Sequence, residues 1–126
     1  MKVSRHHALI LVFIAIFVIV LHEDREKPAY TEQGKASYYA FSLQGRPTAS
    51  GTIFHHDSLT AAHRTLPLGT KLKVVNLEND SSVIVKVNDR GPFVEDRILD
   101  LSRAAFRKLA PLEKGIIEVK IEVVER

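Results

Sequence analysis

Apolar side chains occupy every second position along three stretches of this chain, residues 71–77, 83–89 and 115–124. Val83, Val85 and Val87, for example, occupy every second position and so share one register. A period of two is the spacing of a β-strand, in which successive side chains point to opposite faces. Each stretch is therefore predicted to be a strand with one face toward a core.

The rest of the folded region adds two more strands and little helix. Residues 35–42 predict a first strand and residues 58–63 a short one, and the glycine- and proline-containing residues 45–57 predict a long loop between them. Helical spacing is confined to residues 101–111, where Ser102 is suited to the N-cap position. Several short strands with one short helix favour an all-β fold. Closure into a small barrel is expected because it leaves no strand edge exposed.

The N-terminus has a different character. Lys2 and Arg5 precede an unbroken apolar run of 14 residues, 8–21. As a helix this run would measure about 21 Å, which is short of the ~30 Å hydrocarbon core of a bilayer. Its length and flanking charges fit a secretory signal, but no small-x-small cleavage motif follows it. Residues 1–21 are therefore expected to be either a signal peptide or an uncleaved membrane anchor, and both predict export.

Domain organisation and composition restrict the classes of function that this chain can have. Residues 22–33 are charged and show no period, which predicts a linker, and residues 34–126 are expected to form one domain. Without Lys2 and Arg5, the 18 basic residues fall to 16 against 15 acidic ones, and no basic cluster stands out. Nucleic acid is therefore not an expected partner. The absence of cysteine excludes disulfides, thiolate catalysis and a lipid-bearing cysteine in this sequence.

Asp89 continues the apolar register of the strand that contains Val83, Val85 and Val87. A buried carboxylate costs several kcal/mol unless it is paired, hydrogen-bonded or protonated. At the mouth of a barrel such a group could act as a general acid. It could equally accept backbone hydrogen bonds at the turn that Gly91 begins. The residue pattern alone leaves both roles open.

The histidines offer a second group of candidates. His63 ends the short strand, where either a structural or a catalytic role fits. His55, His56 and Asp57 precede it by a few positions and raise the question of a zinc site. Their spacing matches no established ligand pattern, and the adjacent histidines would diverge. Neither a metal nor a cofactor is therefore predicted.

Two further side chains stand out near the predicted elements. Asp100 precedes the N-cap Ser102, and a carboxylate there suits the positive end of a helix, so Asp100 is expected to tie the loop to the helix N-terminus. Tyr38 and Tyr39 are neighbours on a strand and must face opposite ways. One of them could stack on a sugar ring, although a core-and-surface pair is an equally suitable interpretation.

These residues, in this order, resemble the rare lipoprotein A (RlpA) family of the bacterial envelope over nearly all of residues 34–124. The resemblance implies a six-stranded double-psi β-barrel, similar to that of expansins and some endoglucanases, with the activity of an endolytic lytic transglycosylase of peptidoglycan. It is carried by the motifs "GKASYYA", "PTASG", "LTAAHRTLPLGTKLKVVNL", "VIVKVNDRGPF" and "RILDLSRAAFRKLA".

The resemblance also implies roles for particular residues. Asp89 would be the catalytic carboxyl group and His63 would orient it or the glycan. The glycan strand would be contacted by Tyr39, Thr48, Asn88 and Arg90.

This chain departs from the family pattern after "TASG". Family members usually carry acidic residues at the positions of Thr52 and His55. His55 and the nearby Asp57 are therefore candidates only for an auxiliary role.

The implied reaction cleaves the bond between N-acetylmuramic acid (MurNAc) and N-acetylglucosamine (GlcNAc) and leaves 1,6-anhydro-MurNAc ends. Because the sugar's own 6-hydroxyl replaces water, one carboxyl group can serve where hydrolytic glycosidases generally need two. The alternative function is a non-catalytic, expansin-like module that binds wall glycan, which the loss of the acidic pair would favour.

Partners and location follow from these expectations. The expected partners are peptidoglycan glycan strands, the membrane through residues 8–21 if that segment stays attached, and proteins of the division site. The expected location is the periplasm or cell envelope, with residues 8–21 as a candidate anchor in the inner membrane.

Overall fold

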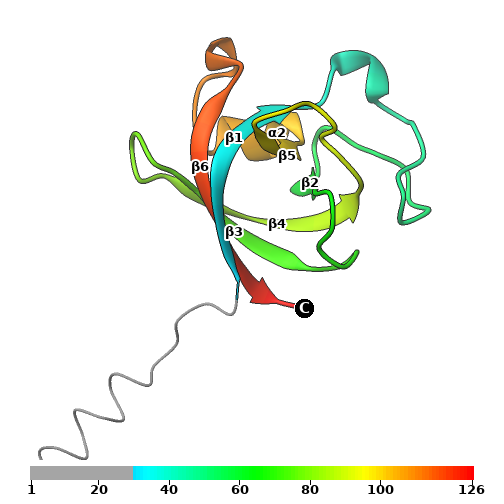
Figure 1. Cartoon of the computed structure of the whole chain (residues 1–126). Helices are drawn as coiled ribbons and strands as arrows, with labels where there is room; N and C mark the ends of the chain where they lie inside the picture. The colour runs from blue at the N-terminus through cyan, green and yellow to red at the C-terminus, as the bar shows by residue number, and fades with distance from the viewer. Residues whose placement is uncertain (1–29) are drawn as a thin grey trace, which may run out of the picture.

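The computed structural model describes residues 30–126, so the expected signal or anchor segment and most of the expected linker lie outside the described residues. Within the described part of the chain, no helix is long and apolar enough to cross a bilayer. Six strands close into a barrel in the order β1-β5-β2-β4-β3-β6 (Figure 1), as expected. The elements are β1 (Thr31–Tyr38), the 3-10 turn η1 (Phe41–Leu43), β2 (Thr60–Ala62), β3 (Lys71–Asn76), β4 (Ser82–Asp89), β5 (Arg97–Leu101), the helix α2 (Arg103–Arg107), the 3-10 turn η2 (Leu112–Lys114) and β6 (Ile117–Glu125).

The alternating residues fill the barrel. Eight apolar residues in the inward register of β3, β4 and β6 are at most 8% exposed, and the residues between them, including Ile84 at 46%, are partly or fully exposed. Burying one such side chain contributes about 1.5–3 kcal/mol, so this pattern supplies most of the driving force for closure. The inward set confirms the prediction and comprises Leu72, Val74, Val83, Val85, Val87, Ile117, Val119 and Ile121.

The first strand begins earlier than expected. Its register with β6 starts at Thr31, which pairs with Glu122, so residues 31–33 belong to the barrel and not to the linker. The sequence of this half-strand is polar because one face is exposed and the other only partly covered. No apolar alternation therefore marked it.

The sixth strand, β5, was not identified separately in the sequence. Leu99 and Leu101 point inward and are fully buried, but Ser102 follows directly and begins the helix. Its hydroxyl accepts a hydrogen bond from the Ala105 amide at 3.2 Å, which confirms the predicted N-cap. Leu101 thus belongs to a strand although it also fits the helical spacing.

The connection between β1 and β2 is the predicted long loop. It projects from one side of the barrel (teal in Figure 1), while α2 packs against β1 and β5. An isolated bridge pairs Pro47 with Ile53, so the loop folds back on itself. Its turn is anchored over the end of β4, where the Ser50 amide donates to the Asn88 carbonyl at 3.0 Å.

Candidate active site

Strand register brings the candidate carboxylates to one end of the barrel. Asp89 on β4 pairs with Ala62 on β2, Ala62 pairs with Asp100 on β5, and Asp100 pairs with Ser37 on β1. These four positions form a row across four neighbouring strands. Two parallel pairs, β1–β5 and β2–β4, flank the antiparallel β2–β5 pair and produce this row.

The carboxylate of Asp89 is half-buried and held by three donors. Its Oδ1 accepts hydrogen bonds from the backbone amides of Ala49 and Arg90, each at 2.9 Å. Its Oδ2 accepts one from the Tyr39 hydroxyl at 2.7 Å. Because two amides already occupy Oδ1, Oδ2 is the oxygen on which a transferable proton can reside.

Tyr39, which donates a hydrogen bond to Asp89, is itself held in place by aromatic stacking. Its ring stacks on the buried Phe54, with centroids 4.1 Å apart and planes 13° apart. Burial, followed by the hydrogen bond to Asp89, raises the pKa of the Tyr39 phenol above its usual value near 10.0. The phenol therefore stays protonated and keeps its hydrogen bond to Oδ2 across the neutral range.

The raised pKa of Tyr39 predicts a loss of stability in alkali. Above pH 10 the unfolded chain releases the phenolic proton and the folded chain keeps it, so the free energy of unfolding falls as pH rises. The contribution is about 1.4 kcal/mol per pH unit for one proton. Urea unfolding of the Tyr39→Phe variant between pH 10 and 11.5 should therefore show a shallower decline than the parent. If the free energy of unfolding fell equally steeply with pH in both chains, the raised pKa of Tyr39 would be contradicted. The range pH 7–9 is the internal control, because the phenol stays protonated there in the folded and the unfolded chain.

A hollow of about 470 Å³ opens in front of Asp89. This volume lies within the roughly 300–1,000 Å³ of ligand pockets. Phe93 stands at its edge with 82% of its surface exposed. We call this space the Asp89 hollow; its lining is Tyr38, Tyr39, Ala40, Leu43, Asp89, Arg90, Gly91, Pro92, Phe93, Val94, Arg97 and Asp100.

The loop that carries Phe93 is held by Arg64. The guanidinium donates to the backbone carbonyls of Pro92 at 2.6 Å, Val94 at 2.8 Å and Arg97 at 2.6 Å. Three charge-assisted hydrogen bonds from one side chain fix a loop that has few apolar contacts of its own. An exposed aromatic ring is thereby kept in place beside the carboxylate.

His63 lies next to Asp89 in the sheet, but its ring points elsewhere. The ring is 3% exposed, its Nε2 meets Glu32 Oε1 at 2.9 Å, and its Nδ1 accepts the amides of Thr65 and Leu66 at 3.1 Å each. Because Nδ1 accepts two amides, Nε2 is the ring nitrogen that donates to Glu32. Only the His63 backbone amide reaches Asp89, through its carbonyl at 3.1 Å. The expected side-chain contact between the two residues is not formed, and the ring fixes the turn instead.

Arg90 and Asp100 line the Asp89 hollow while making structural contacts. Arg90 Nη1 donates to the Leu66 carbonyl at 2.7 Å and so joins the same turn. Asp100 accepts the Ser37 hydroxyl at 2.6 Å and lies 3.7 Å from Arg97 Nη1. The structure therefore shows Asp100 joining β5 to β1, whereas the sequence predicted a tie to the helix N-terminus; Ser102 caps that helix.

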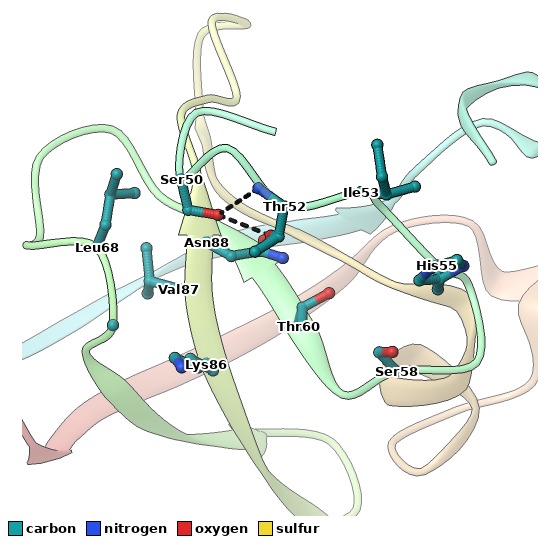
Figure 2. A pocket seen from close by; sticks show the side chains of 11 residues that line it. Ser50, Thr52, Ile53, His55, Ser58, Thr60, Leu68, Lys86, Val87 and Asn88 are labelled. Atoms are coloured by element: carbon teal, nitrogen blue, oxygen red, sulfur yellow. Dashed lines mark hydrogen bonds between the residues drawn. The ribbon is translucent and has the colours of Figure 1, made fainter. Parts of the chain in front are cut away.

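The remaining candidates lie in the long loop or, for Asn88, on β4 beside it. Thr48 is 8% exposed, and its hydroxyl donates to the Thr52 carbonyl at 2.8 Å, so it shapes the loop. Asn88, Thr52 and His55 line a second hollow of about 430 Å³ (Figure 2). Asp57 is exposed and lines neither hollow. Neither auxiliary candidate therefore joins Asp89.

Several contributors to the site were not anticipated. The Ala49 amide carries no sequence signal because any residue except proline offers one. Phe54, Arg64 and Glu32 act through contacts between distant segments, which a sequence pattern does not display. Phe93 could have been noticed, since an aromatic residue directly after a Gly-Pro turn is placed for exposure.

The sequence matches the family model described as "Lytic transglycolase" over residues 31–121. It is 46% identical over 101 residues to "Endolytic peptidoglycan transglycosylase RlpA" of Pasteurella multocida, covering 80% of this chain and 34% of that protein. With the protein of the same name from Pseudomonas aeruginosa the identity is 48% over 97 residues, covering 77% and 28%. The chain thus spans about a third of the length of the curated relatives it matches.

Solved structures show the same fold. The "Streptomyces papain inhibitor (SPI)" aligns with a TM-score of 0.64 at 29% identity, covering 78% of this chain and 97% of that one. The apo expansin of Clavibacter michiganensis aligns with a TM-score of 0.60 at 28% identity, covering 76% and 51%. Together with the family match, these similarities show that the chain belongs to the RlpA-like lytic transglycolase family of double-psi β-barrel proteins.

Proposed function

We propose that this domain is a lytic transglycosylase that cleaves the MurNAc–GlcNAc bond of peptidoglycan and leaves 1,6-anhydro-MurNAc ends. The observation that carries the proposal is the Asp89 carboxyl group, which two backbone amides fix at Oδ1 and which belongs to a residue that lines a ligand-sized hollow. The names of the curated relatives support the same reaction.

The chemistry needs one proton carrier and no bound water. Asp89 gives the proton on Oδ2 to the bridging oxygen, and the bond from that oxygen to the MurNAc anomeric carbon breaks. The MurNAc 6-hydroxyl then bonds to the anomeric carbon, and Oδ2 takes up the hydroxyl proton. The two product chains together contain the same atoms as the substrate, and Asp89 ends with a proton on Oδ2, as it began. Tyr39, bonded to Oδ2 at 2.7 Å, keeps this oxygen in position throughout.

Among residues 30–126, the surroundings of Asp89 supply a single available carboxyl group. Asp100 also lines the hollow, but Ser37 and Arg97 engage it. A hydrolytic mechanism would require a second carboxyl group to activate water or attack the sugar. The arrangement therefore favours attack by the substrate's own hydroxyl. Phe93, exposed at the edge, is placed to stack on a sugar ring.

A non-catalytic glycan-binding module is the second candidate. Two observations favour it: the similarity to an expansin structure, and the positions of Thr52 and His55, which bring no carboxyl group toward Asp89. A mutant of the Clavibacter michiganensis expansin has been solved in complex with cellohexaose. A glycan-filled hollow without turnover would satisfy this function.

Product analysis separates the two candidates. The purified 126-residue chain is incubated with sacculi, and the soluble products are identified by mass spectrometry. The transglycosylase is expected to release fragments with anhydro-MurNAc ends, each lighter than the hydrolytic product by one water. Reducing ends would instead show hydrolysis. Sedimentation of the chain with the wall, without release of fragments, would show binding alone.

The proposed substrate is consistent with a cell-envelope location. The export predicted from residues 1–21, the candidate inner-membrane anchor at residues 8–21 and contacts with division-site proteins stay predictions. Mass measurement of the exported chain distinguishes a removed signal peptide from a retained anchor.

A further inference from the structure

Glu32, at the start of β1, meets the buried ring of His63. Its Oε1 accepts a hydrogen bond from His63 Nε2 at 2.9 Å and another from the Tyr30 hydroxyl at 3.2 Å. The Glu32 side chain is 33% exposed and that of His63 only 3%. Because a buried N–H without an acceptor is costly, the carboxylate of Glu32 determines how the ring lies.

The other nitrogen of the His63 ring fixes a tight turn. Nδ1 accepts the backbone amides of Thr65 and Leu66 at 3.1 Å each, so the chain wraps around the ring. Nδ1 can accept only while the ring proton is on Nε2, which donates to Glu32. The bond to Glu32 therefore holds the ring in the tautomer that the turn requires. We call residues 63–66 the His63 turn.

Two arginines bind the His63 turn to the edge of the Asp89 hollow. From the turn, Arg64 donates to three carbonyls of the segment that carries Phe93, at 2.6–2.8 Å. In the opposite direction, Arg90 Nη1 donates to the carbonyls of the first and last residues of the turn, at 3.3 and 2.7 Å. The conformation of the turn is thereby coupled to residues 90–97.

The segment around Phe93 has little other support. Residues 93–96 are all exposed and belong to neither a strand nor a helix. Its backbone hydrogen bonds are long: the Asp96 carbonyl accepts the Lys35 amide, and the Val94 carbonyl accepts the Arg97 amide, both at 3.3 Å. A segment with few buried contacts is ordered mainly by such bonds and opens easily when they are lost. The position of Phe93 therefore depends on Arg64, and that of Arg64 on the His63 turn.

We propose that Glu32 is a positioning residue that keeps Phe93 ordered at the edge of the Asp89 hollow, acting through the His63 ring and Arg64. Glu32 does not line the hollow, so its effect on the reaction is indirect. The inference rests on the proposed function for the role of Phe93, which is to hold a sugar ring. The ordering of Phe93 itself requires neither glycan nor turnover.

Fluorescence anisotropy at position 93 tests this ordering. The 126-residue chain contains no tryptophan, so Phe93→Trp supplies a single reporter at an exposed position. In this reporter chain, Glu32→Ala should lower the anisotropy toward the value of Arg64→Ala, which removes the three bonds directly. Combining both substitutions should lower it no further, because residues that act in one network are not additive. Glu32→Gln, whose Oε1 can still accept from both partners, should keep the parental value.

Glu122→Ala is the matched control. Glu122 is another partly buried carboxylate, 3.2 Å from Lys120 Nζ, and it pairs with Thr31 of β1. The contacts that the structure gives it among residues 30–126 do not include the His63 turn. Its substitution should leave the anisotropy unchanged. A drop equal to that of Glu32→Ala would show a general loosening of the barrel and overturn the proposal.

Three further results would overturn it: an unchanged anisotropy in Glu32→Ala, an additional drop in the double variant, or a drop in Glu32→Gln. Thermal unfolding shows whether each chain is folded. If Glu32→Ala is not, Glu32→Asp takes its place, because its carboxylate is one methylene too short for the same bond, and it should lower the anisotropy.

Kinetics with the native Phe93 link the ordering to the reaction. Glu32→Ala should raise the amount of cell wall needed for half-maximal release of anhydro products and change the maximal rate less, since Asp89 keeps its bonds from Ala49 and Tyr39. A fall in the maximal rate alone would overturn the role in holding glycan. If no chain released anhydro products, the transglycosylase would be refuted, whereas the anisotropy would still decide whether Glu32 positions Phe93.

Discussion

Replacing Asp89 by Asn should lower the release of anhydro-MurNAc products by about 10²- to 10⁴-fold, the usual contribution of a general acid–base residue. The variant should nevertheless fold. An asparagine Oδ1 can still accept the amides of Ala49 and Arg90, and its Nδ2 can donate to the Tyr39 oxygen. What it lacks is a proton that can be given to the bridging oxygen and recovered from the 6-hydroxyl.

The measurement compares initial rates of product release from sacculi with the thermal midpoint of each chain. Asp80→Asn is the matched control, because Asp80 is exposed in the β3–β4 turn and its φ of 60° suits asparagine. The control should keep its rate. If Asp89→Asn released products at the parental rate, the carboxyl group would not be the proton carrier. If the variant failed to fold, the carboxylate would have to be assigned to the structure of the barrel end.

The position of Asp89 could be predicted from the sequence, but its partners could not. It shares a register with Val83, Val85 and Val87, and a period of two extends that register to the barrel mouth. Its hydrogen bond from Ala49 joins residues 40 positions apart through a backbone amide. Such a contact depends on how the long loop folds back, and no side-chain pattern records that.

His63 is a second residue that the sequence identified without its partner. The sequence identified the residue, and the structure shows its ring bonded to Glu32, in the part of β1 assigned to the linker. That half-strand is polar because its partner strand, and not a buried face, holds it in place. Hydrophobic patterning detects strands that bury a face, and it misses those recruited by hydrogen bonding to a neighbour.

The second large effect is expected at Phe54, which the sequence placed only in a loop. Phe54 is 2% exposed, and its ring lies 4.1 Å from that of Tyr39. Phe54→Ala should cost about 3–5 kcal/mol of unfolding free energy, as for other buried phenylalanines. It should also reduce activity by about ten- to a hundredfold in the molecules that remain folded, because Tyr39 loses the surface that aims its hydroxyl at Asp89.

Phe106→Ala separates the two effects, since Phe106 on α2 is equally buried but packs on the ring of Tyr38, whereas Phe54 stacks on the ring of Tyr39 that donates to Asp89. Both alanine variants should lose similar stability in urea unfolding. Activity divided by the folded fraction should stay near the parental value for Phe106→Ala and fall for Phe54→Ala. Equal activity per folded molecule in the two variants would show that Phe54 contributes only to stability. If either alanine variant is unfolded at the assay temperature, Phe54→Leu and Phe106→Leu replace the pair. The leucine at position 54 fills part of the space but offers no flat face to Tyr39, so the difference in activity should persist while the loss of stability shrinks.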